Sequence, residues 1–452
     1  MSAPATAPAA RPKSDVSAAV GLVGLAGLLA WVAFARAFPA IAETFDWAVP
    51  RDTLGGRSSA LVGLLAAALP MAAWSIFVEK VHLRPSTGLD WSLPSRREPD
   101  RAVTWVKLAG LWATWAIIAG LYCLCRWYWD GQYLFSMQVL AYAAIPLVVL
   151  SLLYVPWLDR ALVEPRDHAW HFGAMLLLRP GWDAREVLSH WRVWIIKAFF
   201  TAFMVSIVPF AFHTIVTADF GEVAARPERI ALTIIEAMFM IDVMIGTVGY
   251  IVTMRPLDAH IRSGNPLLAG WVAALICYPP IVWGILGNGR AINYEQNTAG
   301  WVHWMAGNDT LLALWGAVLV ALTGVYAWAT FAFGLRFSNL TYRGVLTNGP
   351  YRFTRHPAYV SKNLFWWAAV LPFLVTSGSP VDANRNSFFL VVVNAIYFWR
   401  AKTEEAHLLA EDPKYREYYA WMGANGLITA PLSRLVRLFT PRAGSAAAQP
   451  AE

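Results

Sequence analysis

Two polar stretches near the C-terminus carry side chains that are suited to chemistry. Residues 348–359 read Asn-Gly-Pro-Tyr-Arg-Phe-Thr-Arg-His-Pro-Ala-Tyr and are followed by Val-Ser-Lys-Asn. Residues 400–407 read Arg-Ala-Lys-Thr-Glu-Glu-Ala-His, and Tyr415, Tyr418 and Tyr419 follow them. A polar cofactor can be enclosed by carboxylates, an imidazole and guanidinium groups among aromatic rings, and the same groups can transfer protons.

The paired carboxylates also have a simpler interpretation. Glu404 and Glu405 lie close in sequence to Arg400 and Lys402, and on a solvated helix end they would merely balance those charges. Composition alone does not separate this structural role from a role in a site.

The backbone around the first stretch is constrained by its glycine and prolines. Gly349-Pro350 predicts a turn, and Pro357 disfavours helix at His356 while suiting the first turn of a following helix. The apolar residues between 364 and 401 predict a helical hairpin, which would bring the two polar stretches together.

Composition defines the elements that must position these residues. Of the 452 residues 58% are hydrophobic and only 14% are charged, against about 25% charged in soluble domains. This excludes a disordered chain, a collagen-like chain and an ordinary cytosolic enzyme, and predicts an all-α, polytopic helical membrane protein.

The net charge of +7 suits anionic lipid headgroups. Because no basic patch concentrates that charge, we expect no nucleic-acid partner.

The hydrophobic pattern predicts about ten membrane segments. A helix needs about 20 apolar residues to cross the hydrocarbon core. The candidates are residues 16–38, 58–80, 103–125, 133–157, 193–216, 230–254, 267–287, 310–334, 364–377 and 386–401. The last two are short and form the predicted hairpin.

The distribution of basic residues orients these segments. With ten crossings, 28 of the 36 Lys and Arg residues fall in one set of alternate loops, together with both termini. The positive-inside rule then places both termini in the cytoplasm. The first segment, with Arg11 and Lys13 before it and Ala33-Phe34-Ala35 near its end, also loosely resembles a cleavable secretion signal, and cleavage stays open as an alternative.

Two further groups of polar residues are candidates for a functional or metal site. Glu236 and Asp242 interrupt the sixth segment, and ionisable groups at membrane depth either pair structurally or serve a function. His168 and His171 are three residues apart and would share a helix face, but only Asp167 and the distant His190 could complete a metal site, so we expect no metal here.

The order of the C-terminal motifs resembles a known family. Gly-Pro-Tyr-Arg…Arg-His-Pro-Ala-Tyr, a hydrophobic hairpin, Arg…Glu-Glu…Leu and Tyr…Tyr, over about residues 336–422, resemble the isoprenylcysteine carboxyl methyltransferase (ICMT) family, whose wider relatives include membrane phospholipid and thiol methyltransferases. The resemblance implies an integral membrane methyltransferase with an ICMT-like catalytic half. It implies that S-adenosyl-L-methionine binds from the cytoplasm and that a lipophilic small-molecule or lipid acceptor enters from the bilayer.

The same resemblance implies a set of site residues. The cofactor pocket would take Tyr351, Arg355, His356, Pro357 and Tyr359 from the first stretch, and Arg400, Glu404, Glu405 and Tyr418 from the second. Arg355, His356, Glu404 and Glu405 would be the catalytic residues. The chain departs from the family by about seven additional spans, and by Lys362-Asn363 where smaller residues are expected.

The acceptor decides what those residues must do. Methyl transfer from a sulfonium is an in-line displacement, so alignment and desolvation are the main tasks. A carboxylate or thiolate acceptor needs no base, whereas an amine or hydroxyl acceptor does. His356, Glu404 and Glu405 are the local candidates for such a base.

These expectations divide the chain into four parts. Residues 1–14 and 441–452 are Ala/Pro-rich and predict disordered tails. Residues 15–308 form a multi-span membrane region of unknown role, and residues 309–440 form the ICMT-like methyltransferase region.

Two other functions compete with methyl transfer. Sterol reductases are similar in the shape of their C-terminal half, and Arg343, Arg352 and Arg355 would suit the 2′-phosphate of NADPH in an NADPH-dependent membrane oxidoreductase. A non-enzymatic transporter or scaffold is the third possibility, and Glu236 and Asp242 at membrane depth favour it.

Overall fold

The computed structural model describes residues 10–50, 52–95, 98, 100–431 and 433–434. This part of the chain is helical, with a single two-stranded antiparallel pair formed by β1 (Ser263–Gly264) and β2 (Thr341–Tyr342). Ser263 lies opposite Tyr342 in that pair. The predicted all-α, polytopic membrane class is therefore confirmed. The predicted tail at 441–452 lies outside the described residues.

Within the described ranges, seven helices are long and apolar enough to cross a membrane. They correspond to the first six predicted segments and the eighth. They are α1 (Ala18–Thr44), α2 (Arg57–Ala73) with a π-helical turn at Trp74–Val78, α3 (Arg101–Cys125), α4 (Leu134–Ala161) with a 3-10 turn at Gly131–Tyr133, α6 (Ala184–Thr217), α8 (Pro227–Ile251) and α12 (Asp309–Phe331).

The other three predicted segments do not form helices that meet this criterion of length and composition. Residues 267–287 break into α9 (Leu268–Leu275) and α10 (Val282–Ile285), because Pro279-Pro280 lies between them and offers no amide hydrogens. Residues 364–377 contain only the end of α13 (Pro357–Val370), and residues 386–401 lie within the longer α14 (Pro380–Glu411), whose last turns are charged.

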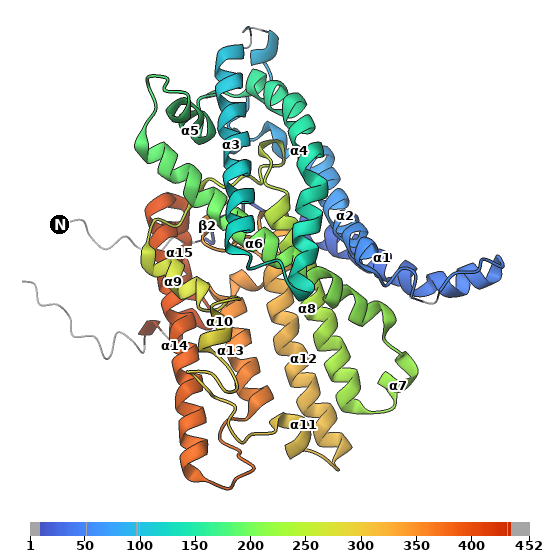
Figure 1. Cartoon of the computed structure of the whole chain (residues 1–452). Coiled ribbons are helices and arrows are strands. Elements are labelled where there is room, and N and C mark those ends of the chain that lie inside the picture. Colours follow the sequence, from blue (N-terminus) through green and yellow to red (C-terminus); the bar gives the residue numbers. More distant parts are fainter. Residues whose placement is uncertain (1–9, 51, 96–97, 99, 432, 435–452) are drawn as a thin grey trace, which may run out of the picture.

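Short helices and turns complete the described chain. They are α5 (His168–Leu176), α7 (Phe220–Ala224), α11 (Gly300–Trp304) and α15 (Pro413–Asn425), with 3-10 turns at Val81–Leu83, Pro85–Thr87, Leu93–Ser95, Arg255–Leu257, Gly334–Arg336 and Gly349–Arg352. Between α8 and α12 the chain passes through α9, which contacts α14, then through α10, and then through α11, which contacts α13 (Figure 1).

Helix α8 lies at the centre of the packing. It contacts α6 on one side and α12 on the other, and α12 in turn packs against α13. Met244, Ile245 and Val248 of α8 are buried in the largest hydrophobic cluster. Gly249 is required where the chain after α12 crosses α8, since a Cβ there would lie 2.3 Å from the carbonyl oxygen of Phe337.

The segment before α1 is attached to the C-terminal region. We call residues 12–16 the N-terminal strap. The amide of Asp15 donates to the carbonyl of Val345 (2.9 Å), and the carboxylate of Asp15 accepts from the amide of Val345 (2.7 Å) and pairs with Lys414. The predicted disordered tail, residues 1–14, thus reaches into an ordered part, since Thr347 bonds to Pro12 and Ser14. Residues 1–9 lie outside the described residues.

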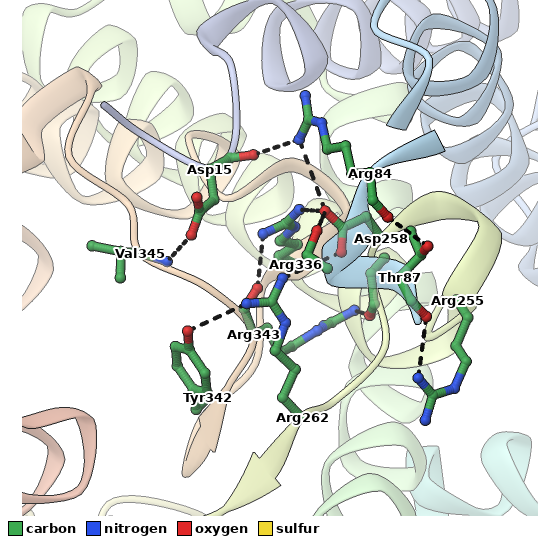
Figure 2. A network of polar contacts seen from close by, with 12 residues as sticks. Asp15, Arg84, Thr87, Arg255, Asp258, Arg262, Arg336, Tyr342, Arg343 and Val345 are labelled. Carbon is green, nitrogen blue, oxygen red and sulfur yellow. Dashed lines mark hydrogen bonds and ion pairs between the residues drawn. The ribbon is translucent and has the colours of Figure 1, made fainter. Parts of the chain in front are cut away.

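A buried cluster of arginines joins the strap, the 255–264 loop and the chain after α12 (Figure 2). Asp258 accepts from Arg336 (2.5 Å), Arg262 (3.2 Å) and Ser86 (2.8 Å), and Arg84 lies 3.9 Å from it. We call Arg84, Asp258, Arg262, Arg336 and Arg343 the arginine knot.

Arg343 has a different kind of partner from the rest of the knot. Its guanidinium donates to five backbone carbonyls, those of Gly249, Val252, Ala259, Leu335 and Phe337. Gly249 and Val252 lie at the C-terminal end of α8, where carbonyls have no partner within the helix. Arg343 therefore joins the end of α8 to the segment that follows α12.

The polar residues of the earlier spans have local partners. Asp242 is buried in α8 and accepts from Tyr326 (3.0 Å) and Thr330 of α12, whereas Glu236 is exposed. His168 contacts His190 (3.0 Å between Nδ1 atoms), while His171 accepts from the amide of Asp183 (3.0 Å). The two α5 histidines thus have separate partners.

Candidate active site

A cavity of about 170 Å³ lies where the end of α12, the start of α13, the last turns of α14, and α15 meet. Tyrosines and charged groups dominate its wall. The tyrosines are Tyr278, Tyr326, Tyr351, Tyr359, Tyr397, Tyr415 and Tyr418, and the charged or titratable groups are Arg336, Arg343, Arg355, His356, Lys362, Arg400, Glu404 and His407.

The first polar stretch folds as its glycine and prolines predict. Gly349 has a φ of +55°, and a Cβ there would lie 3.2 Å from the Trp328 indole nitrogen, so both the backbone conformation and the close approach require glycine. His356 has a non-helical backbone (φ −130°, ψ 61°), and Pro357 begins α13. This places His356 and Tyr359 on the first turn of α13, facing α14.

Glu405 is the buried anchor of the wall. It accepts from Arg355 Nε (3.0 Å), His356 Nε2 (3.1 Å) and Lys402 Nζ (2.7 Å), and its side chain is 4% exposed. Burial alone would raise its pKa, but the hydrogen bond and charge of His356, with Arg355 and Lys402, lower the pKa of Glu405 to about 2. Glu405 is therefore ionised and holds Arg355 and His356 in place.

Glu404 is the carboxylate that lines the cavity itself. It accepts from the Tyr359 hydroxyl and from Arg400 Nε (3.2 Å), and Arg400 also donates to Asn339 (2.6 Å). The His356 ring stacks on Tyr359 with centroids 5.5 Å apart and planes within 4° of parallel. One carboxylate beside aromatic faces suits a cationic group of a ligand.

Helix α15 closes the cavity through its tyrosines. The Tyr418 hydroxyl donates to the carbonyl of Tyr351 (2.6 Å), and the Arg355 guanidinium lies 3.8 Å from the centre of the Tyr419 ring. Because α15 begins directly after α14, the paired tyrosines of the second stretch cover the residues of the first stretch.

Residues 310–410 match the model of the isoprenylcysteine carboxyl methyltransferase (ICMT) family. This segment is ICMT-like. The match covers α12, the connecting chain, α13 and nearly all of α14, and it supports a membrane methyltransferase segment in an integral membrane protein. No curated protein and no solved structure matches the chain.

The ICMT-like segment supplies most of the predicted site residues, and the cavity brings most of them together. Those that line it are Tyr351, Arg355, His356, Tyr359, Arg400, Glu404 and Tyr418. Pro357 and Glu405 do not line it. Pro357 only starts α13, and Glu405 faces the cations behind the wall. The predicted resemblance began at about residue 336, whereas the ICMT match begins earlier, with α12.

Several lining residues were not predicted. Tyr278 precedes Pro279-Pro280, before the ICMT match begins, and Asn339 lies in the chain that follows α12. Tyr326 and Tyr397 lie inside apolar stretches of α12 and α14, where a polar side chain among apolar neighbours was the available signal. Spacing alone did not show that these four residues meet.

Proposed function

We propose that this protein transfers a methyl group from S-adenosylmethionine to a lipophilic or membrane-embedded acceptor at the cytoplasmic face of the membrane. The observation that carries the proposal is the cavity of the ICMT-like segment, with Glu404 among tyrosine rings and the clamped Arg355 and His356 beside it. The excess of Lys and Arg in one set of loops supports the cytoplasmic side.

The groups that line the cavity suit S-adenosylmethionine, which carries two cationic groups and one carboxylate. Glu404 and the rings of Tyr359 and Tyr278 would hold a cationic group, and the Arg355 guanidinium would hold the carboxylate. When bound, S-adenosylmethionine supplies an activated methyl group on a sulfonium.

The side chains of the cavity contribute mainly position and exclusion of water. Glu405 fixes Arg355 and His356, and Arg400 fixes Glu404, so these groups need no rearrangement when a ligand enters. Such positioning is worth several kcal/mol in a displacement reaction. The tyrosines that cover the cavity keep solvent from the reacting atoms.

The contacts give less support to the two alternatives. Of the three arginines that would suit a 2′-phosphate, Arg343 is held by backbone carbonyls, and Arg352 is exposed beside Phe353 and does not line the cavity, which leaves Arg355 alone. For a transporter, Glu236 and Asp242 would need a shared path, but Asp242 is held by Tyr326 and Thr330 while Glu236 faces outward.

Calorimetric titration of the purified full chain in detergent tests the cofactor. We expect S-adenosylmethionine and S-adenosylhomocysteine to bind and NADPH not to bind. Glu404→Gln should weaken S-adenosylmethionine binding by about tenfold or more, because a charge-assisted contact is worth about 1.5–3 kcal/mol. Glu405→Ala and His356→Ala should also weaken it.

Glu222→Gln is the matched control, since Glu222 is exposed and pairs only with Arg229 at the surface. NADPH binding in place of S-adenosylmethionine, or unchanged affinity in Glu404→Gln, would contradict the assignment. Transfer of labelled methyl groups from S-adenosylmethionine into lipids of membranes that contain the protein then tests the reaction.

A further inference from the structure

Lys362 is a charged residue of the cavity that stands apart from the others. Its Nζ lies 5.2 Å from the Trp366 ring centre, 5.4 Å from that of Tyr326 and 5.7 Å from that of Tyr397. It lines the cavity and has no hydrogen bond or ion pair with any residue that the structure describes. Three aromatic rings therefore fix its amine at the wall without neutralising it.

The other acid–base groups of the cavity are already engaged. Glu404 accepts from Tyr359 and Arg400, and His356 is bound to Glu405. His407 contacts the Ser263 hydroxyl at 3.0 Å and Glu411 at 3.5 Å. The sequence named His356, Glu404 and Glu405 as candidate bases, but each of them already has a charged partner in the wall. Among the acid–base groups of the cavity, Lys362 is therefore the candidate base without a hydrogen bond or ion pair from a described residue.

The surroundings of Lys362 include an acidic group from outside the ICMT-like segment. Asp242 of α8 accepts from the Tyr326 hydroxyl (3.0 Å), and the Tyr326 ring also frames the lysine. The charged and titratable groups that act on Lys362 come from every packed element: Asp242 from α8, Tyr326 from α12, Arg400 and Tyr397 from α14, and Cys277 from the chain after α9. Burial lowers the pKa of the Lys362 ammonium, and Arg400 adds to this effect, while Asp242 and Cys277 oppose it.

We propose that Lys362 is the general base of the reaction, that Asp242 is its positioning partner, and that the acceptor is a neutral molecule with a proton on the attacking oxygen or nitrogen. A phenol-type hydroxyl fits, because its acidity is close to that of a lysine, and so does an amine, because the alkylated ammonium that its attack forms has an acidity close to that of a lysine. This inference rests on the proposed methyl transfer and specifies the acceptor of that same cavity.

The step balances in atoms and charge. A lone pair on the acceptor atom forms the new bond to the methyl carbon, the carbon–sulfur bond breaks, and its electron pair stays on sulfur. The acceptor's proton passes to Lys362 Nζ. The positive charge that disappears from sulfur therefore reappears on the lysine, where three rings and Asp242 stabilise it.

The protonation of Lys362 can be measured without turnover. Only a neutral amine is acylated, so the pH dependence of acetic anhydride labelling, read by peptide mass spectrometry on the full chain in detergent, reports the lysine. We expect a labelling midpoint below that of Lys80, which is exposed and has the same side chain. A midpoint at or above that of Lys80 would overturn the proposal.

Asp242→Asn tests the positioning partner in the same measurement. It keeps the shape of the side chain and an oxygen acceptor for one of the two hydroxyls, those of Tyr326 and Thr330, but removes the negative charge that favours the ammonium. The labelling midpoint of Lys362 should move further down in pH, and the acidic limb of the rate profile should move with it. A midpoint that does not move would mean that Asp242 only stabilises the helix packing.

Substitution of the lysine separates a base from an anion-binding cation. Lys362→Arg keeps the charge but cannot lose its proton near neutral pH, and Lys362→Met removes both. Both variants should lower labelled-methyl transfer by about 100-fold or more, as for the loss of a general base. Binding of S-adenosylmethionine should stay within about threefold of wild type, because Lys362 is not among the groups assigned to it. A fully active Lys362→Arg variant would overturn the proposal.

The chemical stability of the label identifies the acceptor class. A methyl group on a phenol oxygen or an amine resists mild base, whereas a methyl ester releases methanol. Base-stable label on lipids of membranes that contain the protein supports the proposal, and base-labile label overturns it. If wild type neither binds S-adenosylmethionine nor transfers label, the proposed function fails. If it does both and Lys362→Arg stays active, only this inference fails.

Discussion

The arginine knot and the cavity wall are both rich in arginine, yet they use it in opposite ways. In the knot, Arg336 is paired with the buried Asp258, and Arg343 is held by five backbone carbonyls. In the wall, Arg355 and Arg400 are paired with the carboxylates of Glu405 and Glu404. All four arginines line the cavity, so Arg343 differs from the wall arginines in being held by backbone carbonyls and not in whether it reaches the cavity.

The difference lies in the groups that accept hydrogen bonds from each guanidinium. Arg343 donates its hydrogen bonds to backbone carbonyls that would otherwise be unsatisfied, which is a structural role. The wall keeps charged groups fixed but turned toward a cavity, which is what binding of a polar ligand requires. His260, near the knot, fits this contrast: burial and the nearby arginines lower its pKa to about 2, so it adds no charge to the knot.

The largest expected effect is on the knot. Arg343→Met leaves five carbonyls without their shared donor, and each unsatisfied group costs about 1 kcal/mol or more. We expect the free energy of unfolding to fall by about 5 kcal/mol, seen as a lower thermal midpoint and a lower yield of folded protein in detergent.

Arg352→Met is the matched control for this substitution, because Arg352 is exposed and contacts only the Phe353 ring. It should change stability by less than about 0.5 kcal/mol. If Arg343→Met were as stable as the control, the knot would not differ from the wall in the way its contacts indicate.

A smaller effect is expected at the anchor of the wall. The folded-state pKa of Glu405 is about 2, below its unfolded value of about 4.5, so its charge stabilises the fold above about pH 4.5 and loses this effect as pH falls toward 2. The contribution at neutral pH is about 3 kcal/mol by linkage. Glu405→Gln should therefore destabilise the protein at neutral pH.

The pH dependence distinguishes this charge from simple packing. The difference in unfolding free energy between wild type and Glu405→Gln should shrink as pH is lowered from about 7 to about 3, because the wild-type carboxyl becomes protonated. A difference that stays constant with pH would show that the shape of the side chain, and not its charge, holds Arg355 and His356.

The smallest effect is expected at the N-terminal strap, which connects the two regions. Asp15→Ala removes the bond from the Val345 amide and the pair with Lys414. Since the strap is only partly buried, we expect a loss of about 1 kcal/mol and faster proteolysis near residue 15. Lys13→Ala, at an exposed position of the same strap, is the control and should change neither. Equal proteolysis of both variants would mean that Asp15 does not hold the strap.

Much of the fold follows from patterns that are local in sequence. The first six spans and α12 could be predicted because each is a continuous apolar run, and α13 because a proline marks its start. The segment at 267–287 could not, since hydropathy averages over Pro279-Pro280, which break the helix. The strap was missed because its contacts with Val345 and Lys414 join residues that are far apart in the chain.

The site shows the same limit at the level of single residues. Glu404 and Glu405 are adjacent in sequence and were assigned the same role, but on a helix adjacent side chains point in different directions. Only Glu404 lines the cavity, and Glu405 lies behind the wall. Asp242 was known to be an unusual group at membrane depth, while its position behind Tyr326 and Lys362 depends on how α8 packs against α12.

By itself, the sequence determined the membrane class, the likeness to the ICMT family and seven of the site residues that line the cavity. These depend on hydropathy, on short motifs and on their order, which are properties of neighbouring residues. Only the tertiary structure decided which charges are paired, which arginines hold the backbone, and that Lys362 faces the cavity without a hydrogen bond or ion pair from any described residue. Those outcomes depend on contacts between distant helices, and the free energy of a buried charge is set by the groups that packing brings to it.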